Sequence, residues 1–208
     1  MTFTLPTWRT LAIITSAILA VLLVGLAGWL WTSAQQQRGM AVYAETLARA
    51  RQGESSASAE ARMQAIRGLE SVLAQYPSNS MAPQAAYELG NLRFAAHDYD
   101  KARAAYQVAI AKTGSGTLAT LARAGIGYAW EAERKFTDAI QAYQTALADL
   151  KSAAFHYEDL LVDLARAQEL AGKKDEAIAT YRRILKDLPR SGRAADVRNR
   201  LASLGAAP

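Results

Sequence analysis

The hydrophobic pattern divides the chain into two unlike parts. No charged residue occurs between Leu11 and Trp31, a run made mostly of leucine, isoleucine, valine and alanine. At ~1.5 Å per residue, a helix of about 21 residues spans roughly 32 Å, which matches the roughly 30 Å hydrocarbon core of a bilayer. The run therefore predicts a single transmembrane helix, with residues 1–33 as an N-terminal membrane anchor.

The flanks of this run favour an anchor over a cleaved signal peptide. Trp8 precedes the run, and Trp29 and Trp31 close it, as suits the two membrane interfaces. A signal peptide would have a shorter apolar stretch of roughly 7–15 residues, followed by a small-x-small cleavage site. Thr32-Ser33-Ala34 is a poor cleavage site.

The charges around the run do not settle its orientation. Arg9 and the amino terminus precede it, whereas Arg38, Arg49 and Arg51 follow it. A bare count of basic residues would keep the C-terminal side in the cytoplasm, but long domains translocate largely regardless of charge.

The second part of the chain is rich in alanine and repeats itself. The alanines of the repeat, about 37 residues apart, are Ala65, Ala102, Ala139 and Ala177. In three repeats a small residue precedes the alanine and a tyrosine follows it one helical turn later. The small residues are Gly90, Gly127 and Ala165, and the tyrosines are Tyr106, Tyr143 and Tyr181. The earliest repeat keeps only its second half, at Ala65, Leu69, Val72 and Pro77.

This pattern predicts stacked helical hairpins. Small residues that face one another, as Gly90 and Ala102 would, let two helices approach closely, and the tyrosine fills the gap to the neighbouring helix. One hairpin cannot bury its apolar face alone, so neighbours must stack. We expect an all-α fold with about four hairpins over residues 34–208 and a capping helix at 192–204, whose apolar residues are Ala195, Val197, Leu201 and Leu204.

The leucine–glycine pair, the alanine and the later aromatic residue resemble the tetratricopeptide repeat family over roughly residues 40–204. The match is weakest in the first repeat, whose first helix, about 40–52, is followed by Gly53-Glu54-Ser55-Ser56. With a span that ends in Gly-Trp-Leu-Trp, the chain also resembles the ancillary SecYEG translocon subunit family, and Tyr76-Pro77-Ser78 resembles repeats of the periplasmic cell-division coordinator. The resemblance implies a bacterial inner-membrane protein with a cytoplasmic N-terminus and periplasmic repeats.

Stacked helical hairpins usually bind partners on the concave face, which the first helices of the hairpins build. By repeat register, the candidate partner-binding residues on this face are Tyr87, Asn91, Phe94, Tyr128, Glu131, Arg166 and Glu169. Aromatic residues among them can anchor a partner helix or an extended peptide. The alternative is that Phe94 and Tyr128 are core residues.

No set of residues indicates catalysis. The chain has no cysteine, and His97 and His156 are too far apart for a local metal motif. Gly114-Ser115-Gly116 lacks the following Gly-Lys-Ser/Thr of a phosphate loop, and His97 fits an exposed turn between helices. We therefore expect no enzyme, no catalytic or metal site, no cofactor and no small-molecule substrate.

The formal net charge of +5 is concentrated near the C-terminus, because seven basic and two acidic residues lie between Arg182 and Arg200. This basic end is a solvated cap or a surface for anionic lipid or an acidic partner. Nucleic acid is disfavoured, since no aromatic residue interleaves with these charges.

These observations predict a membrane-tethered protein–protein interaction module. Our first hypothesis is a scaffold for protein translocation, with translocon subunits or periplasmic chaperones as partners. The second is an adaptor for envelope-assembly or cell-division proteins in the periplasm. The third is a cytosol-facing import receptor with an N-terminal anchor.

Overall fold

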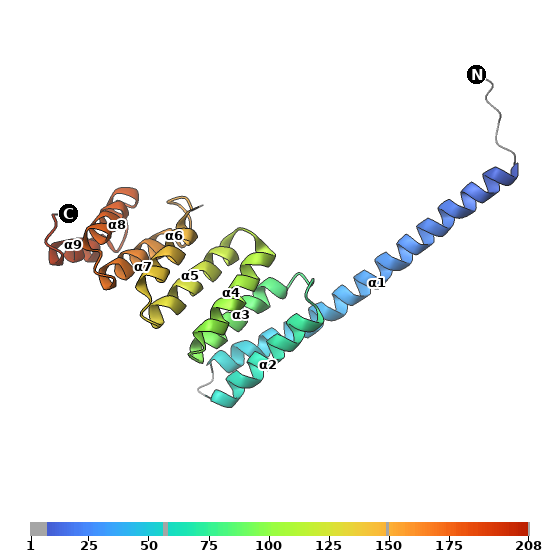
Figure 1. Ribbon diagram of the computed structural model, residues 1–208, viewed down its shortest axis with the longest axis horizontal. Coiled ribbons are helices and arrows are strands. Elements are labelled where there is room, and N and C mark those ends of the chain that lie inside the picture. Colours follow the sequence, from blue (N-terminus) through green and yellow to red (C-terminus); the bar gives the residue numbers. More distant parts are fainter. Residues whose placement is uncertain (1–7, 56–57, 149, 208) are drawn as a thin grey trace, which may run out of the picture.

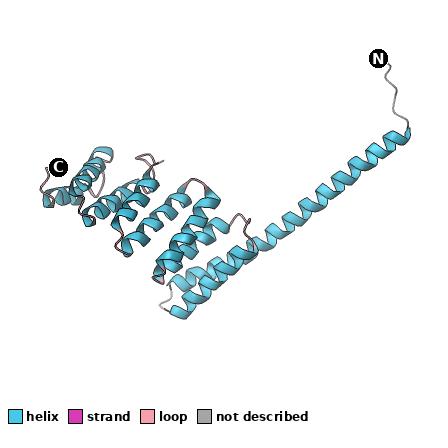
Figure 2. Cartoon of the chain, viewed as in Figure 1, coloured by secondary structure: helices cyan, strands magenta, loops and turns pink. Residues whose placement is uncertain are grey.

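The computed structural model describes residues 8–55, 58–148 and 150–207, and every regular element in these ranges is a helix (Figure 1, Figure 2). The helices are α1 (Trp8–Ser55), α2 (Ala59–Gln75), α3 (Ala82–Ala95), α4 (Tyr99–Thr113), α5 (Thr117–Ala132), α6 (Phe136–Leu147), α7 (Tyr157–Leu170), α8 (Lys174–Asp187) and α9 (Ala194–Ser203). The predicted all-α class is confirmed.

α1 is one helix of 48 residues that holds both the apolar run and the first helix of the first hairpin. Its large apolar side chains from Ile13 to Trp31 are each more than half exposed, and this part of α1 projects away from the other helices (Figure 1). The stretch Ala12–Gln52 is long and apolar enough to cross a membrane. The apolar run and the predicted repeat helix at about 40–52 are joined, since the intervening glutamines favour helix and no proline interrupts them.

The helices form antiparallel pairs that stack in chain order (Figure 1). α1 pairs with α2, α3 with α4, α5 with α6 and α7 with α8, while α9 packs on α8. Buried alanine and leucine side chains fill the space between the helices, and α3 also packs against α5. The pairing reproduces the predicted hairpins and their cap.

The repeat tyrosines fill the spaces opposite the repeat glycines. A Cβ atom on Gly90 would lie 2.4 Å from the Tyr106 ring, and one on Gly127 would lie 2.3 Å from the Tyr143 ring. The sequence placed Ala102 opposite Gly90, but the closest side chain is Tyr106, one turn later. The missing side chains of the glycines make room for whole aromatic rings, because close-packed interiors leave no other space for them.

The turns inside three hairpins share one backbone conformation. His97, Arg134 and Gly172 stand at equivalent repeat positions, with φ angles of 60°, 61° and 74°. This left-handed conformation costs a non-glycine residue roughly 1–2 kcal/mol, whereas glycine adopts it freely. His97 is exposed in the turn between α3 and α4, where the sequence predicted it.

The C-terminal cap is α9, whose buried residues are Ala194, Val197 and Leu201. The prediction that Ala195 lies on the apolar side is wrong, because Ala195 is exposed. Positions 194, 197 and 201 follow the i, i+3, i+7 spacing of one helix face, which leaves Ala195 on the other side. Leu204 is half-buried, as expected for the end of that face.

Candidate functional site

A concave groove of about 590 Å³ crosses the first helices of three hairpins. Its walls come from α3, α5 and α7, with Tyr106 on α4 and Arg193 in the segment before α9. The predicted partner-binding residues that line the groove are Tyr87, Asn91, Phe94, Tyr128 and Arg166. Glu131 and Glu169 lie outside this lining and bind other side chains of the protein.

One half of the groove is aromatic. The Tyr87 and Tyr106 rings lie 5.8 Å apart between centroids, and the Tyr106 hydroxyl donates to Asn91 Oδ1 at 2.9 Å. Gly125 forms part of the lining, where a Cβ atom would lie 2.6 Å from the Tyr106 ring. Aromatic faces held in place by such contacts are suited to packing against the apolar side chains of a partner.

Phe94 and Tyr128 have mixed surroundings. Phe94 is half-buried and its ring lies 5.4 Å from that of Tyr99, whereas Tyr128 is 39% exposed. Both line the groove. Phe94 lies near the end of α3, packs against the buried cluster around Tyr106 and lines the groove.

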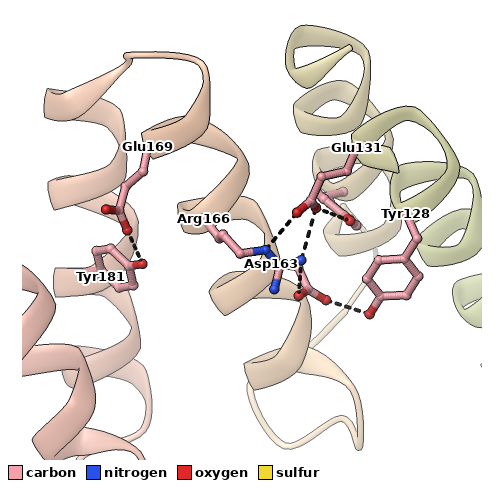
Figure 3. Close-up of polar contacts among 7 residues, drawn as sticks. Tyr128, Glu131, Asp163, Arg166, Glu169 and Tyr181 are labelled. Carbon is pink, nitrogen blue, oxygen red and sulfur yellow. Dashed lines mark hydrogen bonds and ion pairs between the residues drawn. The ribbon is translucent and has the colours of Figure 1, made fainter. Parts of the chain in front are cut away.

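The other half of the groove is crossed by a polar network that links α5, α6 and α7 (Figure 3). Arg166 places its Nε 2.8 Å from Glu131 Oε1, and its Nη2 2.9 Å from Asp163 Oδ1. The Tyr128 hydroxyl donates to Asp163 Oδ2 at 2.6 Å, and the Tyr143 hydroxyl donates to Glu131 Oε2 at 2.9 Å. The network fixes the fourth hairpin against the third.

Burial sets the electrostatics of this network. Burial raises the pKa of the Asp163 carboxyl, although hydrogen bonding from Tyr128 and the Arg166 charge oppose the shift. Burial and the hydrogen bond to Asp163 also raise the pKa of the Tyr128 hydroxyl well above its usual value. The hydrogen bond with Glu131 raises the pKa of Arg166, which keeps the guanidinium charged. Both carboxyl groups of the network, those of Glu131 and Asp163, therefore share the positive charge of Arg166.

Glu169 repeats the role of Glu131 one hairpin later. The Tyr181 hydroxyl donates to Glu169 Oε1, as the Tyr143 hydroxyl donates to Glu131 (Figure 3). Burial and this hydrogen bond raise the pKa of Tyr181. Both glutamates precede their repeat tyrosine by the same interval, which is the sequence signal for this internal pairing. The structure therefore gives these two predicted partner-binding residues an internal contact.

The end of the groove near α9 contains residues that the sequence did not predict as partner-binding. Arg193 Nη2 lies 2.7 Å from Asp159 Oδ1, and His156 Nδ1 lies 3.7 Å from Asp159 Oδ2. All three residues line the groove. Within the described parts of the chain, no group of three or more histidine and carboxylate side chains is placed to hold a metal ion.

The basic end is partly neutralised by internal contacts. Arg183 donates to the Tyr157 hydroxyl at 2.7 Å and lies 3.3 Å from Asp187. Arg182 donates to the Ala207 carbonyl at 2.9 Å, and Arg193 pairs with Asp159 as described. These arginines stabilise the C-terminal hairpin and its cap, so the charge run is not a uniform free surface.

Stacked antiparallel hairpins with a concave groove define the class of helical-repeat interaction scaffolds. The chain belongs to the tetratricopeptide repeat-like domain family, whose sequence model matches residues 6–206. Repeats of this family imply a protein–protein interaction scaffold, and their fold is typically non-catalytic. A comparison with curated proteins gives no match.

Several solved structures share the fold. The chain is similar to a tetratricopeptide repeat protein from Parabacteroides merdae, with a TM-score of 0.63 and 14% identity, over 79% of this chain and 60% of that one. It is similar to tetratricopeptide-like repeats of a putative kinesin light chain from Podosopora anserina, with a TM-score of 0.61 and 15% identity, over 81% and 85% of the two chains. The MamA protein has a TM-score of 0.53 and 21% identity, over 64% and 67%. At these identities the likeness shows the fold alone.

Proposed function

We propose that this chain is a membrane-tethered interaction module that binds partner proteins in its concave groove. The observation that carries the proposal is α1, one helix of 48 residues that joins an exposed apolar stretch to the first hairpin of the repeat stack. Such a tether keeps the groove at a high local concentration beside partners in or near the same membrane.

The groove favours a protein segment with apolar or aromatic anchoring side chains. Tyr87, Phe94 and Tyr128 offer partly exposed rings in its lining, and aromatic contacts dominate the energy of many interfaces. At the other end, Arg166 and Asp163 are already paired with each other, so they act as a polar rim that orients the partner. We therefore propose a helix or an extended peptide as the bound segment.

We place α1 in a bacterial inner membrane, with the N-terminus in the cytoplasm and the repeat domain in the periplasm. The resemblance to the ancillary translocon subunit family supports this placement, and the partners are then translocon subunits or periplasmic chaperones. The alternative is an envelope-assembly or cell-division adaptor. The resemblance of Tyr76-Pro77-Ser78 to repeats of the cell-division coordinator supports the alternative, and the alanines that belong to that resemblance, Ala82 and Ala85, are both buried.

Photo-cross-linking in membranes tests where partners bind. A photoreactive phenylalanine analogue replaces Phe94 in the groove or, as the matched control, Val108, which is 41% exposed on α4 and lies outside the groove lining. We expect protein cross-links from position 94 that are missing from position 108, with the partner identified by mass spectrometry. Equal cross-linking from both positions, or none from position 94, contradicts groove binding.

The identity of the cross-linked protein separates the two functions. Translocon subunits or periplasmic chaperones support the first function, and septal or outer-membrane assembly proteins support the alternative. A dual periplasmic and cytoplasmic reporter fused after Pro208 tests the topology. A cytoplasmic signal contradicts the proposed periplasmic domain.

A further inference from the structure

The turn between α2 and α3 is clamped to α1 just beyond the apolar stretch (Figure 1). Asn79 is buried in this turn, and its Nδ2 donates to the Gln36 carbonyl at 3.2 Å. Tyr43 on α1 donates its hydroxyl to the Tyr76 carbonyl at 3.1 Å. Gly39 lies beneath the turn, where a Cβ atom would come within 2.8 Å of Asn79 Nδ2 and 3.2 Å of the Tyr76 ring. The turn therefore moves with α1 as one body.

The register of α1 fixes the height of this turn above the apolar stretch. Trp31 ends the stretch, and Gln36 follows about five residues later, ~8 Å further along the helix axis. The headgroup layer on each side of a bilayer is about 5–8 Å thick, because a ~30 Å hydrocarbon core sits within ~40–45 Å overall. Since α1 continues without a break through this region, the Asn79 end of the turn, held at Gln36, falls at the level of the phospholipid headgroups, and its Tyr76 end, held by Tyr43, lies further from the bilayer.

A pocket of about 320 Å³, lined by both polar and apolar groups, opens at the same level. It lies between Trp31 and Gln36 on α1 and the residues Gln75 to Asn79 of the turn. The Gln75 amide and the Ser78 hydroxyl in its lining can donate to phosphate and ester oxygens, and the Trp31 indole ring is of the kind found at membrane interfaces. Lys112 brings a positive charge to the turn, because its Nζ donates to the Pro77 carbonyl.

We propose that this pocket and the α2–α3 turn bind the headgroup of a glycerophospholipid. The first hairpin then rests on the bilayer surface and does not swing on a flexible tether. The inference rests on the membrane insertion of α1, which belongs to the proposed function. The consequence is that α1 sets the direction of the whole repeat stack, whose later hairpins extend to one side of it (Figure 1).

Single-cysteine labelling of the full chain tests this contact. The chain has no cysteine, so Ser78→Cys in the turn and Ala96→Cys beyond the far end of α3 each create one labelling site, and both positions are exposed. The labelled proteins are reconstituted into vesicles of equal amounts of phosphatidylethanolamine and phosphatidylglycerol that contain a phospholipid with a nitroxide on its headgroup. We expect the nitroxide to quench a fluorophore at position 78 several-fold more strongly than one at position 96.

A register variant separates the height of the turn from its chemistry. Seven polar, helix-forming residues inserted between Ser33 and Ala34 add about two helical turns. They lift the α2–α3 turn ~10 Å further from the bilayer and keep it on nearly the same side of α1. We expect quenching at position 78 to fall to the level measured at position 96.

Vesicle flotation separates the two ways of failing. If the full chain does not float with the vesicles, α1 is not an anchor, and the proposed tether and the headgroup contact both fail. If the chain floats but position 78 is quenched no more than position 96, the headgroup contact is overturned while the anchor stands. Unchanged quenching in the register variant overturns it equally.

Discussion

Arg166 on α7 holds both carboxylate oxygens of Glu131 on α5, with Nε 2.8 Å from Oε1 and Nη2 3.0 Å from Oε2. A guanidinium that engages both oxygens of a carboxylate makes a strong and directional pair. The two residues belong to adjacent hairpins, and one of them lines the groove. The pair therefore fixes the spacing of the third and fourth hairpins and, with it, the width of the groove.

Replacing Arg166 with methionine tests this role in stability. We expect the variant to lose about 1–3 kcal/mol of unfolding free energy, because Glu131 and Asp163 then face each other without their shared cation. Urea unfolding of the full chain in detergent, followed by circular dichroism, measures the loss. Arg190→Met, at an exposed position, is the control and changes stability by less than about 0.5 kcal/mol. A loss no larger than that of the control contradicts the role.

Gly127→Ala tests the packing of the repeat tyrosines. Alanine in place of glycine ordinarily stabilises a helix by up to ~1 kcal/mol. Here the added Cβ would lie 2.3 Å from the Tyr143 ring, so we expect a net destabilisation of about 1–3 kcal/mol in the same unfolding assay. Gly192→Ala, where no atom lies within 4 Å of the new Cβ, serves as the control. A stabilised Gly127→Ala variant rules out the close contact.

The hairpin turns make a pair of opposite predictions. At Gly172, φ is 74° and no atom lies within 4 Å of a new Cβ, so alanine there costs about 1 kcal/mol from backbone strain alone. At the equivalent Arg134, φ is 61°. We expect Arg134→Gly to raise the free energy of unfolding by up to about 1 kcal/mol, because glycine adopts this φ freely. Thermal unfolding of both variants beside the native chain checks the two signs. The same sign at both positions contradicts the shared turn conformation.

The Asp187 carboxyl is expected to make the free energy of unfolding depend on pH. The hydrogen bond from Tyr157, reinforced by the Arg183 charge, lowers the pKa of the Asp187 carboxyl below its ordinary value of 3.8. A carboxyl whose pKa is lowered in the folded state adds stability above its unfolded pKa and loses that contribution as the pH falls through its folded pKa. We therefore expect Asp187→Asn to cost about 1 kcal/mol near neutral pH and progressively less below about pH 4.

Urea unfolding of the native chain and of Asp187→Asn, at neutral and at acidic pH, measures this effect. Asp196→Asn, at an exposed position on α9, controls for the loss of one negative charge. A difference between Asp187→Asn and the native chain that grows on acidification has the wrong sign for the proposed hydrogen bond.

The groove makes a prediction for binding. Tyr87→Ala and Phe94→Ala each remove an aromatic ring from its lining, and we expect each to weaken capture of the cross-linked partner about tenfold or more. Circular dichroism is expected to show that both variants stay folded, since neither ring is fully buried. Val108→Ala is the control with unchanged capture. Unchanged capture by both folded groove variants counts against the groove as the binding site.

The repeat architecture was readable from the sequence because its signals are local. The interval between Ala102, Ala139 and Ala177, with a tyrosine one turn after each, is the pattern of helix faces that pack on their sequence neighbours. The hairpins and the cap follow from it. The same register brought five of the candidate residues to one groove, since equivalent positions of stacked repeats share a face.

The polar partners were not readable in this way. Glu131 and Arg166 were predicted as partner-binding residues, yet they hold each other across 35 positions of sequence. Asp163, which was not singled out, completes their network. Arg193 belongs to a charge run in the sequence but reaches the groove and pairs with Asp159. Such pairs depend on where whole helices lie and on how far each side chain extends.

By itself the sequence determined an apolar run of membrane-spanning length, the helical class and the repeat interval, because helix periodicity and hydrophobicity depend on neighbours along the chain. The tertiary structure alone decided which charges neutralise one another, which rings stay open in the groove, and that α1 carries the α2–α3 turn at a fixed height beyond Trp31. These features depend on distances between helices, which no spacing along the chain specifies.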